Sequence, residues 1–315
     1  MKSGQIIILE STVYPGATED LVAPILEKTG LKAGKDFYLA FSPERVDPGN
    51  HSVRLKDIPK LVGGIDTEST NRAVDFYKHV FERVIPMTSA REAEMAKLLE
   101  NTFRAVNIGL VNELAIMAHS MDINLWEVIA AASTKPFGFM PFYPGPGWGG
   151  HCIPIDPVYL SWRAKVDGLE TGFIDHAVQI NNQMPRYVVD RVADLLNGQG
   201  KPLNNSKVLV LGVTYKRDVA DVRESPALPI LSCLKEKQAI TSYYDPYVRQ
   251  IEHDGLTLKS QCLSGEVLRS QDCVVITTDH SSLDYKFVAE HSSLILDTRN
   301  ASRFLKQKYP HIHLL

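Results

Sequence analysis

The run GPGWGGHCIPIDP, from Gly145 to Pro157, combines glycines and prolines with a single cysteine, Cys152. Glycine lets a backbone approach a ligand closely, and proline stiffens the same loop. A cysteine in a shaped loop can act as a nucleophile when a base or cation nearby favours the thiolate. Asp156 follows four residues later and is close enough in the chain to share a site with it. The alternative interpretation is a Gly/Pro turn that holds an ordinary buried cysteine.

A second polar pair, Lys97 and Asn101, lies in a long apolar segment without proline that ends near Met121. Ser89 and Glu92 form a capping box at its start, so we expect a helix. Residues four apart share one helix face, and a buried lysine or asparagine needs a partner. The alternative is that both side chains are exposed to solvent.

Further candidates follow predicted strands. Thr12 comes after the apolar run 5–9, and Glu44 and Arg45 come after the run 36–41. The carboxyl ends of strands in open α/β sheets bind ligands, which favours a functional role for these residues. The alternatives are helix-capping chemistry for Thr12 and a solvated surface pair for Glu44 and Arg45.

The elements that must position these residues form three segments. Residues 1–88 alternate between strands and helices and predict a partial parallel sheet. Residues 89–198 predict helices, with an apolar excess that suggests a dimer face. After the linker GQGKPLNNS, residues 203–315 return to β/α alternation. The expected strands are 5–9, 36–41, 60–64, 84–87, 207–211, 240–244, 272–278 and 294–296. The expected helices are 18–29 with Thr18 as its cap, 67–80, 89–121, 124–133, 174–196 and 226–236.

The first loop of the last segment carries Lys216, Arg217 and Arg223, and cations in such a strand-to-helix loop can meet a phosphate. The alternative is a solvated surface turn. The loop has one glycine where a dinucleotide fingerprint has three. The only formal GxGxxG run, GPGWGG, follows no predicted strand and opens no predicted helix, so it fails that test.

Composition excludes several classes of protein. A formal net charge of −3 offers no electrostatic basis for binding nucleic acid or an anionic membrane. No apolar run approaches the ~20 residues of a membrane span. The four cysteines show no CxxC and no metal-like spacing, which fits a reducing cytoplasm and predicts no metal site.

Several stretches in one order carry a resemblance: STVYPG, FSPERVDPG, AEMAKLLENTFRAVNIGLVNELA, GPGWGGHCIPIDP, GVTYKRDVADVRESP and YDPY. Together they resemble the UDP-glucose/GDP-mannose dehydrogenase family over nearly the whole chain. The cysteine loop is most similar to that of members that oxidise UDP-N-acetylhexosamines, UDP-N-acetylglucosamine above all. The resemblance implies an α/β fold: a partial Rossmann-like sheet (1–88), an all-helical dimerisation domain (89–198) and a Rossmann-like nucleotide-sugar domain (203–315).

The implied activity is a two-step, NAD-dependent oxidation of the C6 alcohol of a UDP-sugar to the acid, for surface polysaccharide biosynthesis in the cytoplasm. The implied partners are the UDP-sugar and a second copy of the chain. UDP-N-acetylmannosamine and UDP-glucose are alternative substrates. The implied catalytic residues are Cys152 as nucleophile, Lys97 and Asn101 at the developing alkoxide, Asp156 in proton transfer, Glu44 in water activation and Thr12 beside the nicotinamide.

The implied binding residues fall into two sets. Substrate contacts are assigned to Arg45, Gly145, Gly147, Gly149, Gly150 and Lys216. Thr12 and Arg223 are assigned to the cofactor, Arg223 at its phosphates. His151 adjoins Cys152 but receives no role as a base, because neighbours in an extended loop point apart.

Two departures from the family pattern matter. Pro48, with Asp47 beside it, stands where the UDP-glucose members have a second glutamate, which favours the N-acetyl subgroup. The family also opens with a glycine-rich dinucleotide loop, and we expect about a hundred residues of that βαβ module to be missing from this chain. We therefore also expect, as an alternative, a truncated and inactive chain that only binds a UDP-sugar and dimerises.

Overall fold

The computed structural model describes residues 1–46 and 54–315 and divides into two compact units. The first unit comprises Met1–Arg104 and Ile155–Asp175, and the second comprises Ala105–Pro154 and His176–Leu315. The boundary between the units therefore falls inside the segment that we expected to form one helical domain. The domain limits 1–88, 89–198 and 203–315 remain a prediction.

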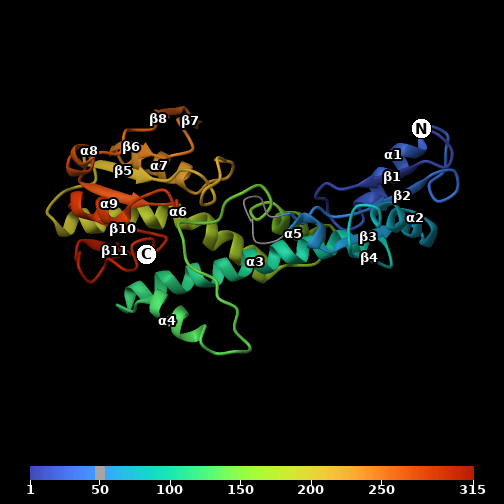
Figure 1. The fold of residues 1–315 in the computed structure, drawn as a ribbon, viewed down its shortest axis with the longest axis horizontal. Coiled ribbons are helices and arrows are strands. Elements are labelled where there is room, and N and C mark those ends of the chain that lie inside the picture. Colours follow the sequence, from blue (N-terminus) through green and yellow to red (C-terminus); the bar gives the residue numbers. More distant parts are fainter. Residues whose placement is uncertain (47–53) are drawn as a thin grey trace. The chain divides into compact units, whose positions relative to one another are not determined.

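The first unit is built on a four-stranded sheet in the order β1-β2-β3-β4 (Figure 1). Its strands are β1 (Ile6–Leu9), β2 (Tyr38–Phe41), β3 (Lys60–Gly64) and β4 (Val84–Pro86). β1 pairs with β2, and β3 with β4, in parallel, but β2 and β3 are antiparallel. The expectation of a purely parallel sheet is wrong, because a short buried apolar run looks the same whichever way its neighbour runs.

The helix α2 (Thr67–Tyr77) covers one face of this sheet. The side chain of Asp66 caps it by accepting a hydrogen bond from the backbone N–H of Ser69 at 2.6 Å. Ala73, Val74 and Tyr77 then form a core cluster with Ala40 and Val62 of the strands. The amphipathic helix expected at 67–80 is thus confirmed, with an earlier end.

Two glycines of β3 set how closely helices approach the sheet. A Cβ at Gly63 would overlap the carbonyl oxygen of Ser89, just before α3 begins. A Cβ at Gly64 would overlap the backbone nitrogen of Thr70 in the first turns of α2. The start of each helix therefore packs directly against the backbone of β3.

The segment after β1 differs from the single helix expected at 18–29. It consists of a π-helical turn at Thr18–Val22 followed by the short helix α1 (Ala23–Glu27). Thr18 is not a cap, because its hydroxyl donates to the carboxylate of Glu94 at 2.6 Å. A tertiary partner 76 residues away has replaced the local capping bond.

Four helices occupy the middle of the chain. They are α3 (Ala90–Ser120), α4 (Leu125–Ala132), α5 (Asp156–Val166) and α6 (Gly172–Gly198). α3 and α6 match the expected helices at 89–121 and 174–196, whereas α5 was not expected. Asn124 stands at the start of α4 but makes no side-chain cap bond.

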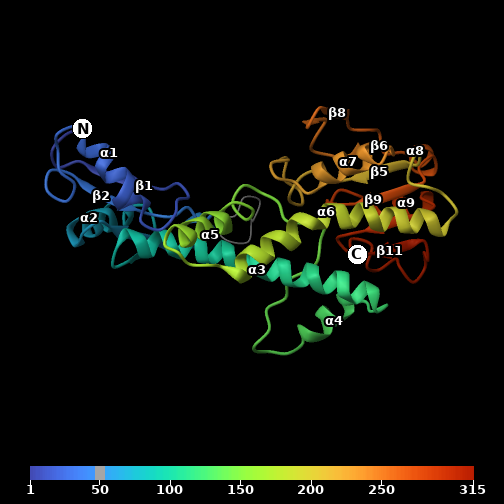
Figure 2. The ribbon, with the colours of Figure 1, turned by 180° about the vertical axis from the view of Figure 1, so that it is seen from behind.

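The second unit contains a five-stranded parallel sheet in the order β11-β10-β9-β5-β6. The strands are β5 (Lys207–Leu211), β6 (Ile240–Tyr244), β9 (Cys273–Ile276), β10 (Ile295–Asp297) and β11 (Ile312–Leu314). Apolar side chains of α6 and α7 (Ala227–Glu236) pack on one face, and those of α8 (Gly265–Arg269) and α9 (Tyr285–His291) pack on the other. Figure 2 shows the ribbons of these helices beside the strands. Helices on both faces of a parallel sheet confirm the expected Rossmann-like architecture.

An unexpected hairpin joins β7 (Gln250–His253) to β8 (Leu256–Lys259). Asp254 and Gly255 form its turn, both with positive φ. Asp-Gly between two short strands is a common sequence signal for such a turn. Across the part of the chain that the structure describes, no helix is both long enough and apolar enough to cross a membrane.

Candidate active site and nucleotide site

Lys97, Asn101 and Asp156 form a polar group inside the first unit. Asn101 donates from Nδ2 to Oδ2 of Asp156 at 2.6 Å. Asp156 is only 1% exposed and Lys97 only 8%. Burial raises the pKa of the Asp156 carboxyl, although the Asn101 hydrogen bond and the Lys97 charge both act to lower it. Of the expected helix pair, Lys97 is therefore buried and Asn101 partly buried, and Asn101 bonds to the carboxyl that opens α5.

Lys97 also connects to the loop after β2. Its ammonium group donates to the backbone oxygen of Glu44 at 2.8 Å. The carboxylate of Glu44 is exposed and accepts from the backbone N–H of Val46 at 2.7 Å. Lys97 thus orders the backbone that carries Glu44, and leaves the carboxylate at the surface.

Arg45 is engaged elsewhere in this unit. Its guanidinium pairs with Glu100 of α3 at 2.6 Å and donates to the backbone oxygen of Pro59 at 2.7 Å. The guanidinium N–H groups that could bind a substrate are therefore already bonded to protein atoms. Asp47 and Pro48, which bear on the glucose question, lie outside the described residues.

In the second unit, the glycine-rich loop is held by two buried asparagines. The backbone N–H of Gly145 donates to Oδ1 of Asn112 at 2.9 Å, and Asn112 Nδ2 donates to Asn181 Oδ1 at 2.8 Å. Further along the loop, Trp148 donates from its indole nitrogen to Asn182 Oδ1 at 3.1 Å. These bonds connect the loop to α3 and α6.

The glycines of this loop allow close packing against protein. Gly147 and Gly150 have φ values of +129° and +87°, which disfavour other residues. A Cβ at Gly149 would lie 2.8 Å from the Tyr215 side chain, and one at Gly145 would lie 2.6 Å from Arg299 Nη1. These glycines thus allow the loop to pack against other residues of the second unit. Contact between these glycines and the sugar stays a prediction.

Cys152 is partly buried. Its Sγ lies 3.8 Å from Nδ1 of His151, and Nε2 of the same ring lies 3.8 Å from Oδ2 of Asp221. The expectation that His151 points away from Cys152 is therefore wrong, because the chain turns here instead of running extended. Asp221 was not singled out from the sequence, because it is 69 residues away from Cys152 in the chain and only the fold brings the two close together.

Arg223 pairs with the same acid. It donates from Nη2 to Asp221 Oδ2 at 2.7 Å, and this hydrogen bond is the main reason that the pKa of Asp221 is lowered. Arg223 also lines a cavity of about 480 Å³, together with Gly147 and Trp148. The loop and the expected phosphate-binding arginine therefore border one space within the second unit.

A buried histidine positions the loop that carries Lys216. His280 is fully buried at the carboxyl end of β9, and its Nδ1 accepts from the backbone N–H of Asp218 at 3.1 Å. Because a backbone N–H can only donate, the ring proton must be on Nε2, which faces Asp245 Oδ2 at 3.0 Å. Thr214 completes the group by donating to the backbone oxygen of Lys216 at 2.9 Å.

Comparison with known proteins assigns these parts. Residues 91–183 match the central domain of the UDP-glucose/GDP-mannose dehydrogenase family, 209–303 match its UDP binding domain and 1–81 its NAD binding domain. The chain is 37% identical over 305 residues to UDP-N-acetyl-D-mannosamine dehydrogenase of Pyrococcus horikoshii, covering 95% of this chain and 70% of that one. The chain belongs to this family.

Other dehydrogenases of nucleotide sugars are also similar to this chain. UDP-N-acetyl-D-glucosamine 6-dehydrogenase of Pseudomonas aeruginosa is 38% identical over 250 residues, which cover 79% of this chain and 59% of that protein. Solved structures from Pyrococcus horikoshii (UDP-D-ManNAc dehydrogenase) and Methanosarcina mazei (NDP-N-acetyl-D-galactosaminuronic acid dehydrogenase) superpose with TM-scores of 0.85 and 0.86. They are 36% and 33% identical, and the matches cover 96% and 100% of this chain and 70% of each of those chains.

The NAD binding domain match corrects one expectation. Because residues 1–81 match this family domain, the expectation that the NAD-binding part is missing is not supported. The alternative of an inactive binding module loses its basis with it. NAD is the cofactor of the family domain to which these residues belong.

The residues after β1 fit part of this cofactor. Thr12 follows the carboxyl end of β1 and is partly exposed, which suits contact with a nicotinamide or ribose. The N–H groups of Gly16 and Thr18, which a helix start would offer to a phosphate, donate instead to Glu94 at 2.5 and 2.9 Å. This turn therefore fits the role given to Thr12 and does not fit a pyrophosphate.

Proposed function

We propose that the chain catalyses the NAD-dependent oxidation of the C6 alcohol of a UDP-N-acetylhexosamine to the uronic acid, for polysaccharide biosynthesis. Family membership supports a nucleotide-sugar dehydrogenase, and the two relatives described above are named for UDP-N-acetyl sugars. The observation that carries the chemistry is the group of buried Lys97 and Asp156 with partly buried Asn101. A buried cation, a partly buried amide and a carboxyl with a raised pKa are suited to stabilise an oxygen atom that first gains negative charge and then a proton.

Cys152 is proposed as the nucleophile of the second oxidation. NAD, when bound, accepts the hydride in each of the two oxidations. Between them, Sγ bonds to the aldehyde carbon C6, and the C=O electron pair moves to O6, which takes a proton. Loss of the C6 hydride and of the O6 proton from this thiohemiacetal leaves a thioester, and water then adds at C6, breaks the C6–Sγ bond and releases the acid and the thiol.

Three side chains are proposed to act on oxygen atoms in these steps. Lys97 and Asn101 stabilise the negative charge that develops on O6. Asp156 holds or supplies the proton there, because a carboxyl with a raised pKa is protonated over a wider pH range than usual.

A second set is proposed to bind and to activate water. The exposed carboxylate of Glu44 activates the water that hydrolyses the thioester. Lys216 and the glycine loop contact the nucleotide-sugar, and Arg223 contacts cofactor phosphates after release from Asp221. Arg45 contacts substrate only if it leaves Glu100.

The test compares the chain with its Cys152→Ser variant. NADH formation and the uronic acid product are followed by absorbance and mass spectrometry with UDP-N-acetylglucosamine, UDP-N-acetylmannosamine and UDP-glucose. We expect acid from an N-acetyl sugar, none from the variant, and nearly unchanged UDP affinity by calorimetry. Cys262→Ser is the matched control, because Cys262 is an exposed thiol without an assigned role.

Two outcomes would contradict the proposal. Equal acid formation by the Cys152→Ser variant would remove the nucleophile assignment. Turnover of UDP-glucose with no turnover of either N-acetyl sugar would overturn the substrate class and leave the general dehydrogenase function intact.

A further inference from the structure

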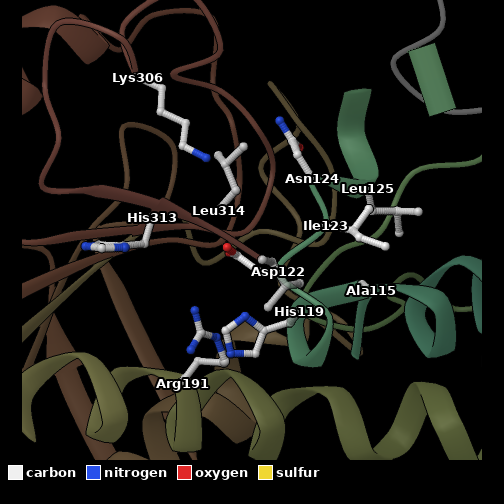
Figure 3. A pocket seen from close by; sticks show the side chains of 11 residues that line it. Ala115, His119, Asp122, Ile123, Asn124, Leu125, Arg191, Lys306, His313 and Leu314 are labelled. Carbon is white, nitrogen blue, oxygen red and sulfur yellow. The ribbon is translucent and has the colours of Figure 1, made fainter. Parts of the chain in front are cut away.

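A cavity of about 370 Å³ lies in the second unit, and no residue with a role proposed above is among those that line it. Its basic side chains come from distant parts of the chain: Arg191 from α6, His119 from the last turn of α3, Lys306 from the segment between β10 and β11, and His313 from β11. Figure 3 shows Arg191 and His119 next to one another, with Lys306 and His313 on other walls of the cavity. Basic groups distant in sequence therefore converge on one space.

Arg191 is the central observation. It is 8% exposed, and its Nε has no hydrogen-bond partner among residues 1–46 and 54–315. Guanidinium groups stay charged in proteins, so burial does not neutralise this side chain. A buried guanidinium N–H without an acceptor is costly, and an anion in the adjoining cavity would remove that cost.

The electrostatics of the neighbouring groups point the same way. Burial lowers the pKa of His119, and the charge of Arg191 lowers it further. Burial also lowers the pKa of His313, followed by the charges of Arg191 and Lys306. Asp122 and Asp194 act on His119 in the opposite direction, but the net shift of its pKa remains downward. Burial is the largest cause of both shifts, and among the charges that act on His119 that of Arg191 is the largest, ahead of Asp194 and of Asp122, which also lines the cavity.

We propose that this cavity binds a small phosphate-bearing molecule, held by Arg191 and Lys306 with His119 and His313 as further donors. A planar guanidinium gives paired hydrogen bonds to phosphate oxygens, and a lysine adds a point charge. The volume lies within the ~300–1,000 Å³ typical of small-molecule sites, so a phosphorylated metabolite fits better than a bare ion. The site is separate from the loop of Lys216, and the inference does not depend on the proposed dehydrogenase activity.

Calorimetric titration of the full chain with inorganic pyrophosphate at low ionic strength tests this site. Lys306 is exposed, so Lys306→Ala should fold normally and weaken binding about tenfold, equal to the loss of one charge-assisted contact. Lys308→Ala is the matched control, because its ammonium group lies over the Tyr309 ring, 5.5 Å from the centroid, and Lys308 does not line the cavity. Arg191→Gln should weaken binding by more than Lys306→Ala.

A second measurement does not depend on variants of buried residues. Histidine-detected NMR should show the pKa values of His119 and His313 rise when pyrophosphate binds, because an anion favours the imidazolium form. Saturating UDP should leave the pyrophosphate affinity unchanged if the two sites are separate.

Three results would overturn the inference. They are no pyrophosphate binding by the folded chain, equal binding by wild type and Lys306→Ala, and competition by UDP with loss of pyrophosphate binding in Lys216→Ala. The last would assign the anion to the nucleotide site.

Discussion

Removal of the Asn112 side chain should loosen the glycine-rich loop without touching any residue assigned to chemistry. Asn112 is fully buried, accepts from the Gly145 N–H and donates to Asn181 Oδ1. Asn112→Ala leaves both of those buried groups without the partner they have in the structure. We expect a less stable second unit and a more mobile loop.

The magnitude follows from the two orphaned groups. A buried donor or acceptor that loses its partner costs about 1–3 kcal/mol, so the pair predicts a loss of about 2–6 kcal/mol. The total stability of a domain is about 5–15 kcal/mol, so this change is large enough to measure.

The Asn112→Asp variant keeps the shape of the side chain but replaces the amide donor by a carboxylate oxygen. The carboxylate can still accept from Gly145 but places an oxygen against Asn181 Oδ1. Asn181 cannot turn its amide to help, because Nδ2 donates to the backbone oxygens of Ala105 at 3.3 Å and Ala177 at 2.9 Å. The variant should therefore be destabilised at neutral pH and partly recover in acid, where a protonated carboxyl can donate.

The assay is urea unfolding followed by circular dichroism, with hydrogen exchange of peptides across 145–150 as the local readout. Asn197→Ala is the control, because Asn197 is an exposed asparagine on the same helix as Asn181 and should change stability by only about ±0.5 kcal/mol. If Asn112→Ala unfolds like the control, and the Gly145 amide stays protected, the reasoning fails.

Three further predictions concern the candidate site and the assembly. Lys97→Ala should lower kcat about 10²–10³-fold with little change in substrate binding, as for loss of one oxyanion donor; a change in KM alone would make Lys97 a binding residue. Because burial raises the pKa of Asp156, its contribution to stability is present below the unfolded pKa of about 3.9 and is lost as pH rises through the folded pKa. Asp156→Asn should therefore have a higher Tm than wild type at pH 8 and a similar Tm near pH 4, and a constant difference would contradict this. Exposed Leu99, Phe103 and Leu110 on α3 predict a homodimer, which light scattering at micromolar concentration checks; a clean monomer would refute it.

The strands could be predicted from sequence because each is a short apolar run between turn residues. Lys60–Gly64, Lys207–Leu211 and Ile240–Tyr244 were expected with the limits that the structure has. Strand direction was not predictable, as β2 and β3 demonstrate, because neighbours decide it. The helix α5 was also missed, since Pro157 near its start looks like part of the preceding Gly/Pro loop.

The candidate site was predictable only in part. The spacing of Lys97 and Asn101 predicted a shared helix face, but no local signal tied them to Asp156 apart from the family resemblance. Glu94 and His280 were missed because each looks like an ordinary polar residue until the fold gives it partners. Their roles depend on contacts more than 60 residues away in the chain.

The two glycines of β3 have a consequence for how substitution data on this chain should be read. Any side chain at Gly63 or Gly64 must displace backbone at the start of a helix, so a saturation library should reject nearly every replacement at both positions. In such a library both glycines would be as intolerant of substitution as Cys152, although neither glycine has a role in the proposed chemistry. A map of intolerant positions would thus overstate the extent of the active site unless protein abundance is scored in parallel.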